Sequence, residues 1–183
     1  MIEQSAMKIE FRLITEKDFS TIYIWENSEH VLQWYGKLPL SQDEINHKYG
    51  GYLSSDNPDT GYIIVIDSIE VGFIQTYYYR DFPSDEYNNL LEADEHSAGL
   101  DIYIGNKDFI HKGYGSHIVS AFLNEYIFAN PRTQNCIITP EPENIAAIKT
   151  YEKSGFKWYK TILTPETKGH EFLMICKNSR RII

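Results

Sequence analysis

Two glycines one residue apart, Gly113 and Gly115, stand just before a long apolar-periodic run that ends near Asn130-Pro131. The periodicity indicates a helix of about four turns that begins at the glycines. The first backbone N–H groups of a helix are unpaired and carry the positive end of its dipole, so glycines there let an anion come close. Glycines also allow the unusual φ angles of a tight bend. An isolated pair favours the simple bend, so the surrounding sequence has to decide.

Two common nucleotide-binding motifs do not fit this turn. A P-loop needs a lysine after its last glycine, whereas Lys112 precedes Gly113. The Rossmann fingerprint needs a third glycine at the position that Ile118 occupies. If the turn binds an anion, it does so as part of another kind of site.

The order of predicted elements indicates a mixed α/β (α+β) fold. Residues 8–14 alternate as a half-buried strand does, and Thr15 is a plausible N-cap of the helix that follows. Ser41 and Glu44 form the pattern of a capping box, and residues 61–79 read as a β-hairpin. Further strands are predicted over 97–105, 135–139, "FKWYKTIL" and "EFLMICK", with a helix over "ENIAAIKTYEKSG" that ends at Gly155. We expect a mixed, mostly antiparallel central sheet flanked by helices, with a βαβα unit late in the chain.

Size and charge narrow the classes of protein. The 183 residues suit a single domain, and 17 basic against 26 acidic residues give a net charge of −9, which disfavours nucleic acid as a partner. No apolar run is long enough for a membrane helix, and two cysteines do not make a disulfide framework, so we expect a cytoplasmic protein. The histidines show no metal-ligand spacing, and no metal is expected. Between positions 81 and 101 stand seven acids without a Lys or Arg: Asp81, Asp85, Glu86, Glu92, Asp94, Glu95 and Asp101. This stretch would attract a polycation, although a solvated face is the commoner role of a charge run.

Two linked motifs resemble the acetyl-CoA-binding core of the GNAT superfamily of N-acetyltransferases. Gly113 and Gly115 match the pyrophosphate loop, of the form Q/R-x-x-G-x-G/A, with Ile110 in place of its leading Gln or Arg. The second motif is an Asn-x-x-Ala…Tyr-x-x-x-Gly-Phe helix, matched in order and spacing by Asn144, Ala147, Tyr151, Gly155 and Phe156. The resemblance implies a GNAT fold over 1–183, with residues 1–7 as a loose tail and acetyl-CoA as cosubstrate.

Within that superfamily the chain resembles the aminoglycoside 6′-N-acetyltransferases. The segments that carry the resemblance are "IYIWENSEHVLQWYG", "VGFIQTYYY", "GLDIYIG", "HKGYG" and "NIAAIKTYEKSGF". Thr139 stands where several relatives have an Asp that shapes the drug pocket, a difference that bears on substrate range. The resemblance implies acetyl transfer to a cationic aminoglycoside and resistance to it. It leaves the drug spectrum and the oligomeric state open.

The resemblance also implies roles for individual residues. Asp101 is expected to hold and deprotonate the acceptor ammonium, and Tyr151 to protonate the departing thiolate. The strand N–H groups at Ile102 or Tyr103, next to Ile104, would polarise the thioester carbonyl. The pyrophosphate is expected on the N–H groups of Lys112, Gly113, Tyr114, Gly115 and Ser116, and the pantetheine arm on Asn144 and Ala147. Substrate binding is expected from Trp34, Tyr35, Tyr78, Glu92, Asp94 and Asp101.

Structural roles compete with several of these assignments. Asp101 could be an ordinary strand-end carboxylate, Tyr151 a packing residue and Asn144 only a helix cap. The aromatic residues could equally belong to the core and the hairpin. At the level of the protein, the alternatives are a GNAT enzyme for another amine (a polyamine, a protein N-terminus or a siderophore precursor) and a binding module for acyl-CoA without catalysis.

Overall fold

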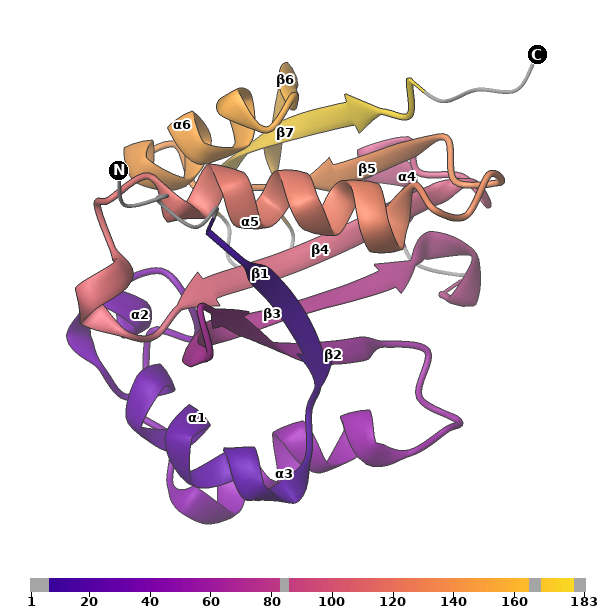
Figure 1. Ribbon diagram of the computed structural model, residues 1–183. Coiled ribbons are helices and arrows are strands. Elements are labelled where there is room, and N and C mark those ends of the chain that lie inside the picture. Colours follow the sequence, from indigo (N-terminus) through magenta and orange to yellow (C-terminus); the bar gives the residue numbers. More distant parts are fainter. Residues whose placement is uncertain (1–6, 83–85, 165–168, 180–183) are drawn as a thin grey trace.

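The computed structural model describes residues 7–82, 86–164 and 169–179, so the predicted N-terminal tail lies, up to residue 6, outside the described residues. Within them, seven strands form one sheet in the order β1-β2-β3-β4-β5-β7-β6 (Figure 1). Neighbouring strands are antiparallel except β4 and β5, which are parallel. The strands are β1 (Ile9–Leu13), β2 (Thr60–Ile66), β3 (Ile69–Tyr78), β4 (Ser97–Ile104), β5 (Asn135–Ile138), β6 (Lys157–Leu163) and β7 (His170–Lys177). The expected mixed, mostly antiparallel sheet is confirmed.

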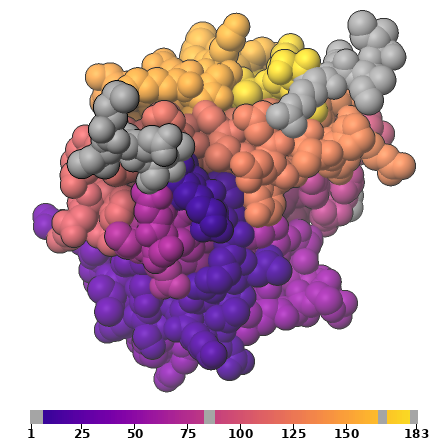
Figure 2. Space-filling view, in the orientation of Figure 1, coloured from indigo at the N-terminus to yellow at the C-terminus, as the bar shows by residue number. Residues whose placement is uncertain are grey.

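Helices cover both faces of this sheet. The α-helices are α1 (Phe19–Glu26), α2 (Glu29–Leu32), α3 (Gln42–Gly50), α4 (Glu86–Leu91), α5 (Tyr114–Phe122) and α6 (Ile145–Lys153). The shorter turns are η1 (Glu16–Asp18), η2 (Gly51–Leu53), η3 (Tyr79–Asp81), η4 (Lys107–Phe109) and the π-helical η5 (Leu123–Ile127). In the space-filling view the orange and yellow C-terminal elements lie against the indigo and magenta N-terminal ones without a visible gap (Figure 2). None of the described helices is long and apolar enough to cross a membrane.

The two faces of the sheet bury different side chains because successive strand residues point to opposite sides. Phe73 and Tyr103 pack in one core cluster with α1 and α3. Their neighbours along the strands, Ile74 and Ile102, pack in a second cluster with α5. Side chains at odd positions of β3 and β4 therefore face α1 and α3 around the middle of these strands.

One edge of β4 is left open along most of its length. β3 pairs with β4 from Ala98 to Ile104, whereas β5 pairs with it only from Ser97 to Gly99. On the β5 side, residues 100–104 face no strand within the described part of the chain. Backbone groups there are available to a ligand, since no β-ladder uses them.

Most predicted elements are found, with two corrections. The hairpin, the βαβα unit and the capping box of Ser41 and Glu44 are confirmed. The acidic stretch, for which no element was predicted, contains the short helix α4. The helix after the glycines is α-helical only to Phe122 and continues as the π-helical η5. The short helix α2 was not predicted.

Candidate active site

Asp101 lies in the middle of β4 and points to the face that carries α1 and α3. Gln75 is its direct neighbour on β3, and the Gln75 amide Nε2 donates a 2.6 Å hydrogen bond to Asp101 Oδ2. The Asp101 side chain is half-buried. Burial raises the pKa of its carboxyl group, while the Gln75 hydrogen bond and the positive charge of Lys48 oppose that rise. The site thus presents a carboxylate with a raised proton affinity beside the open edge of β4.

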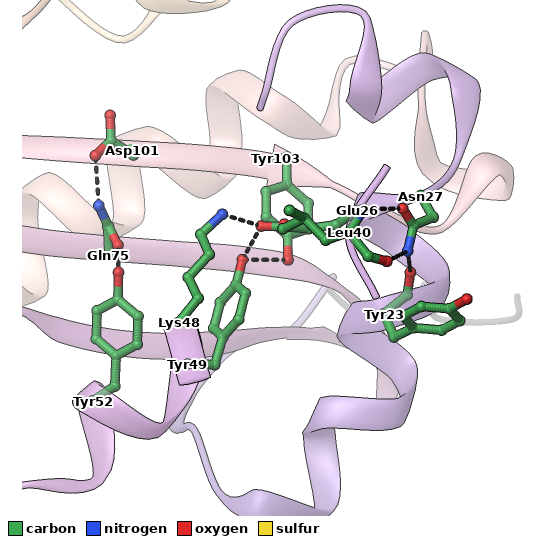
Figure 3. A network of polar contacts seen from close by, with 10 residues as sticks. All are labelled: Tyr23, Glu26, Asn27, Leu40, Lys48, Tyr49, Tyr52, Gln75, Asp101 and Tyr103. Atoms are coloured by element: carbon green, nitrogen blue, oxygen red, sulfur yellow. Dashed lines mark hydrogen bonds and ion pairs between the residues drawn. The ribbon is translucent and has the colours of Figure 1, made fainter. Parts of the chain in front are cut away.

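The Gln75 amide is held from its other end by η2. The hydroxyl of Tyr52 donates to Gln75 Oε1, so that Tyr52, Gln75 and Asp101 form a continuous chain (Figure 3). Asp59 lies just before β2, and burial followed by the Asp101 charge raises its carboxyl pKa. The region around Asp101 therefore holds more than one carboxylate.

A second polar network lies beside this chain under α1 and α3. Lys48 Nζ is 2.7 Å from the buried Glu26 carboxylate, which also accepts from the Tyr49 hydroxyl. The hydroxyl of Tyr49 is 3.1 Å from that of Tyr103, the β4 residue on the same side of the strand as Asp101 (Figure 3). The network fixes α1 and α3 over the sheet and places the Lys48 ammonium near Asp101.

The aromatic residues that were expected to bind the substrate lie on both faces of the sheet. Tyr35 packs edge-on against the Tyr103 ring at 4.9 Å, and Lys48 Nζ lies 4.7 Å from the Tyr35 centroid. Trp34 is half-buried next to it. Tyr78, by contrast, points to the α5 side, where it packs in the core cluster under the Arg80 guanidinium. The structure thus brings Tyr35 near Asp101 and does not bring Tyr78 there.

The glycine turn has the geometry of an uncapped helix start. Gly113 is the N-cap of α5 with a φ of 84°, and no side chain caps it. A Cβ on Gly113 would meet no atom within 4 Å, so the space above it is open. A Cβ on Gly115 would lie 3.1 Å from Thr150 Cγ2 on α6. Gly113 therefore serves the backbone turn, and Gly115 allows α5 and α6 to pack closely.

The other residues of the turn leave its N–H groups accessible. Lys112 is exposed, Tyr114 packs on Phe109 at 5.2 Å, and Ser116 Oγ donates back to the Gly113 carbonyl. No acidic residue lies in the first turn of α5. With the positive end of the helix dipole open and uncapped, the turn suits an anion such as a pyrophosphate.

The start of α6 carries the second predicted motif. Asn144 Oδ1 accepts a 3.1 Å hydrogen bond from the Ala147 N–H, so the capping role of Asn144 is confirmed. Tyr151 is half-buried, and its ring packs 5.7 Å from that of Phe156. Burial and then the Asp101 charge raise the Tyr151 pKa, which keeps its hydroxyl protonated near neutral pH. Tyr151 thus packs against the core and is also close enough to Asp101 for its charge to act on the Tyr151 hydroxyl.

The N–H groups of Ile102 or Tyr103, next to Ile104, were expected to polarise the thioester carbonyl. Because antiparallel pairing alternates, the backbone groups of Ile102 and Ile104 point to the open edge of β4, and those of Tyr103 point to β3. The carbonyl of Ile104 lies 3.0 Å from His30 Nε2 of α2, which closes the end of this edge. The side chain of Tyr103 is buried in the core with Tyr49 and Phe73. Any catalytic contribution of these three residues therefore comes from the backbone.

The two acids singled out in the acidic stretch have partners elsewhere. Glu92 accepts from Tyr159 Oη at 2.9 Å and pairs with Lys160 Nζ at 2.6 Å, both on β6. These contacts hold the pKa of the Glu92 carboxyl below its usual value. Asp94 Oδ1 accepts from the His96 N–H and from Ser97 Oγ within its own loop. The structure thus engages both carboxylates in contacts away from Asp101.

Several residues of the site were missed in the sequence. Gln75 gave a signal, since it is a polar residue within an otherwise apolar and aromatic strand. Lys48, Glu26 and Tyr52 gave none, because their roles depend on contacts between elements far apart in the chain. Cys136 and Cys176 are buried, as expected of core residues. Among the described residues no cluster of His, Cys, Asp and Glu could hold a metal ion.

Known proteins are similar to this chain in both sequence and fold. An aminoglycoside N(6′)-acetyltransferase type 1 of Klebsiella pneumoniae is 27% identical over 168 residues, which cover 91% of this chain and 82% of the relative. The structure of AAC(6′)-Ib with paromomycin and acetyl-CoA superposes with a TM-score of 0.82 at 27% identity, over 96% of this chain and 99% of that one. AAC(6′)-Ib with coenzyme A and kanamycin gives 0.81 at 27% identity, over 93% and 95%.

These similarities confirm the resemblance to aminoglycoside 6′-N-acetyltransferases that the motifs indicated. The family model of the acetyltransferase (GNAT) domain matches residues 15–164, which include β2 through β6 but neither β1 nor β7. The chain belongs to the GNAT family of acetyltransferases.

Proposed function

We propose that this protein, as a single domain, transfers acetyl from acetyl-CoA to the 6′-amine of aminoglycoside antibiotics and so confers resistance to them. The observation that carries the proposal is the half-buried Asp101 carboxylate beside the open edge of β4. The uncapped start of α5, which suits a pyrophosphate, and the second carboxylate near Asp101, that of Asp59, support the proposal. The relatives named above act on or bind aminoglycosides, and their likeness covers nearly the whole chain.

Asp101 acts as the general base on the acceptor side. A protonated 6′-amine is drawn to the carboxylates around Asp101, including Asp59, and gives its proton to Asp101 directly or through a water molecule. A raised pKa suits this task, because a more basic carboxylate takes the proton more readily. The neutral amine is then the nucleophile.

The coenzyme binds through backbone groups on the other side. The N–H groups of residues 112–116 hold the pyrophosphate at the start of α5, and Asn144 and Ala147 contact the pantetheine arm. The thioester carbonyl accepts a hydrogen bond from the Ile102 N–H on the open edge of β4, since the Tyr103 N–H points to β3. Because these donors are fixed in the fold, no reorganisation is needed when negative charge develops on the carbonyl oxygen.

Tyr151 supplies the proton that the leaving group needs. The amine nitrogen forms its bond to the acetyl carbon, and the carbon–sulfur bond breaks. The thiolate takes the Tyr151 hydroxyl proton, and the second proton that leaves the nitrogen returns to the Tyr151 oxygen, directly or through a water molecule. A raised Tyr151 pKa keeps that proton in place until the thiolate forms. The reaction is a direct transfer with no covalent enzyme intermediate, so the buried cysteines take no part.

Trp34 and Tyr35 remain the proposed aromatic contacts of the drug. Tyr35 packs on Tyr103, which lies two residues after Asp101 on the same face of β4, so Tyr35 is on the acceptor side. Tyr78, Glu92 and Asp94 are not retained as drug contacts, because their side chains are engaged in the α5 core, with β6 and within the β4 entry loop.

The test is a thiol-release assay with paired drugs. Kanamycin A and neomycin, which carry a 6′-amine, should be turned over, whereas paromomycin, the 6′-hydroxyl counterpart of neomycin, should not. Equal rates with neomycin and paromomycin would refute the 6′ position. Faster turnover of spermidine or a peptide N-terminus would assign the enzyme to another acceptor, and no turnover of any amine despite acetyl-CoA binding would leave a binding module.

A further inference from the structure

The buried Gln75 makes one hydrogen bond with each end of its amide. Its side chain lies on the Asp101 side of β3, and the residue is only 9% exposed. Nε2 donates to Asp101 Oδ2 at 2.6 Å, and Oε1 accepts from the Tyr52 hydroxyl. A buried polar group that uses both its donor and its acceptor is held in a single orientation.

Tyr52 determines which way round the amide points. Burial raises the Tyr52 pKa, with further contributions from the charges of Asp59 and Asp101, so the phenol keeps its proton near neutral pH. A protonated hydroxyl that donates to the amide needs the oxygen end of the amide, which turns the N–H end toward Asp101. Reversal of the Gln75 amide would place Oε1 against the Asp101 carboxylate and lose that hydrogen bond.

This orientation acts on Asp101 in two ways. An N–H donor stabilises the ionised carboxylate and offsets part of the desolvation cost of burial. It also occupies Oδ2, while the second carboxylate oxygen is directed away from Gln75 (Figure 3). One oxygen is thus used for anchoring and the other stays available to an incoming ammonium group.

We infer that Gln75, oriented by Tyr52, is a positioning residue that holds the Asp101 carboxylate ionised and aimed at the acceptor amine. The inference rests on the proposed base role of Asp101. Gln75 touches neither reacting atom, and its effect passes through Asp101 alone.

Other groups act on Asp101 from the surrounding elements, and each is charged or titratable. They are Tyr35 after α2, Lys48 of α3, Tyr52 of η2, Asp59 before β2, Cys136 of β5 and Tyr151 of α6. Gln75 is neutral at every pH of the assay. Its removal therefore changes the hydrogen bonding of Asp101 without adding or removing a titrating group.

The test compares Gln75→Met, Tyr52→Phe and Thr76→Val with the wild type in the pH profile of kcat/KM. Gln75→Met keeps the length of the side chain and removes the hydrogen-bond donor. The acid limb of the profile, where kcat/KM falls as the pH is lowered, should therefore move up by about one pH unit. The kcat should fall about 10-fold, and the KM for acetyl-CoA should be unchanged. Tyr52→Phe should move the limb in the same direction by about half as much. Thr76, the next residue, donates to the Gly99 carbonyl of β4 from the other face of the sheet. Thr76→Val should lower stability and leave the limb in place.

A second readout separates this inference from the proposed function. The ¹³C carboxyl signal of Asp101, followed by NMR through a pH titration, reports the same shift without any turnover. If the wild type acetylates no amine but the Asp101 titration still shifts in Gln75→Met, the proposed function is refuted and the inference stands. If the wild type turns over kanamycin but Gln75→Met moves neither the acid limb of the kcat/KM profile nor the Asp101 titration, the inference is overturned and the proposed function stands.

Discussion

The two sides of β4 are built by different means. On the coenzyme side, residues 112–116 offer backbone N–H groups from a turn that a few neighbouring residues define. On the acceptor side, Asp101, Gln75, Tyr52, Lys48 and Glu26 come from five separate elements and meet through their side chains (Figure 3). The coenzyme side should therefore be sensitive to glycine substitution, and the acceptor side to the loss of single polar atoms.

The largest expected effect is on the acceptor side. Asp101→Asn keeps the shape of the side chain and removes the base, so kcat with kanamycin should fall about 10²–10⁴-fold. The dissociation constant of acetyl-CoA should stay the same, because the coenzyme site that we propose consists of backbone groups at the start of α5. Calorimetry with acetyl-CoA and steady-state kinetics with kanamycin measure the two quantities. A loss of coenzyme binding in this variant would mean that the two sides are not independent.

The Lys48 to Glu26 pair should show how much the acceptor side depends on compensated charge. Lys48→Met leaves the buried Glu26 carboxylate without its cation, and because the Lys48 side chain is 37% exposed we expect a loss of about 1–3 kcal/mol in unfolding free energy. The Lys48 charge also lowers the Asp101 pKa, so the acid limb of kcat/KM should move upward in this variant.

Urea denaturation of a matched double variant separates charge from packing. Glu26→Gln together with Lys48→Met removes the unpaired Glu26 charge, so the double variant should recover part of the unfolding free energy that Lys48→Met loses. If the double variant is no more stable than Lys48→Met alone, the lost energy comes from packing and not from an unpaired carboxylate.

On the coenzyme side, Gly113→Val should act mainly on acetyl-CoA. A valine at a φ of 84° is strained and places its side chain in the open space above the turn. We expect the KM for acetyl-CoA to rise about 10-fold or more, with the KM for kanamycin changed by no more than about 2-fold. Gly36→Val is the matched control, since Gly36 has a φ of 87° and open space around it but lies outside the turn. An equal rise of the acetyl-CoA KM in both variants would argue against a pyrophosphate site at Gly113.

Gly115 should respond differently, although it belongs to the same motif. A side chain there meets Thr150 of α6, so Gly115→Val should lower the unfolding free energy by about 1 kcal/mol through overpacking. Thr150→Ala in the same chain makes room and should restore much of that loss, which thermal unfolding can follow. A Gly115→Val variant that keeps full stability and loses only coenzyme affinity would assign Gly115 to the ligand instead of to helix packing.

The coenzyme side could be predicted from the sequence because its determinants are local. The glycine turn, the Asn144 cap and the Gly155 terminus each depend on residues within one or two turns of a helix, and all three are found. The capping box at Ser41 is predictable for the same reason. Such motifs fix their own hydrogen bonds, whatever the rest of the fold does.

The acceptor side could be predicted only in part, because strand register and long-range pairing decide it. Asp101 was identified through the family pattern, but its contact with Gln75 follows from the pairing of β3 with β4. Tyr78 was placed with Asp101, although it stands three residues after Gln75 and so points to the opposite face. The alternation alone gives the face of the sheet on which Tyr78 lies, whereas the contact of Tyr52 with Gln75 could not be foreseen.

The smallest expected effect concerns the acidic stretch, where Glu92 contacts Tyr159 and Lys160 of β6. Glu92→Gln should leave the KM for kanamycin unchanged and lower Tm by only about 1–2 °C at neutral pH, because the pairs with Tyr159 and Lys160 are exposed. The hydrogen bonds from Lys160 and Tyr159 hold the Glu92 pKa below its ordinary value, so the stabilising contribution is present above that ordinary value and is lost as the pH falls through the lowered pKa. The Tm difference between wild type and variant should therefore vanish in acid and shrink in high salt, which screens an exposed pair. A raised kanamycin KM at low salt would instead return Glu92 to the attraction of the drug, and the acceptor side would then extend beyond the network around Asp101.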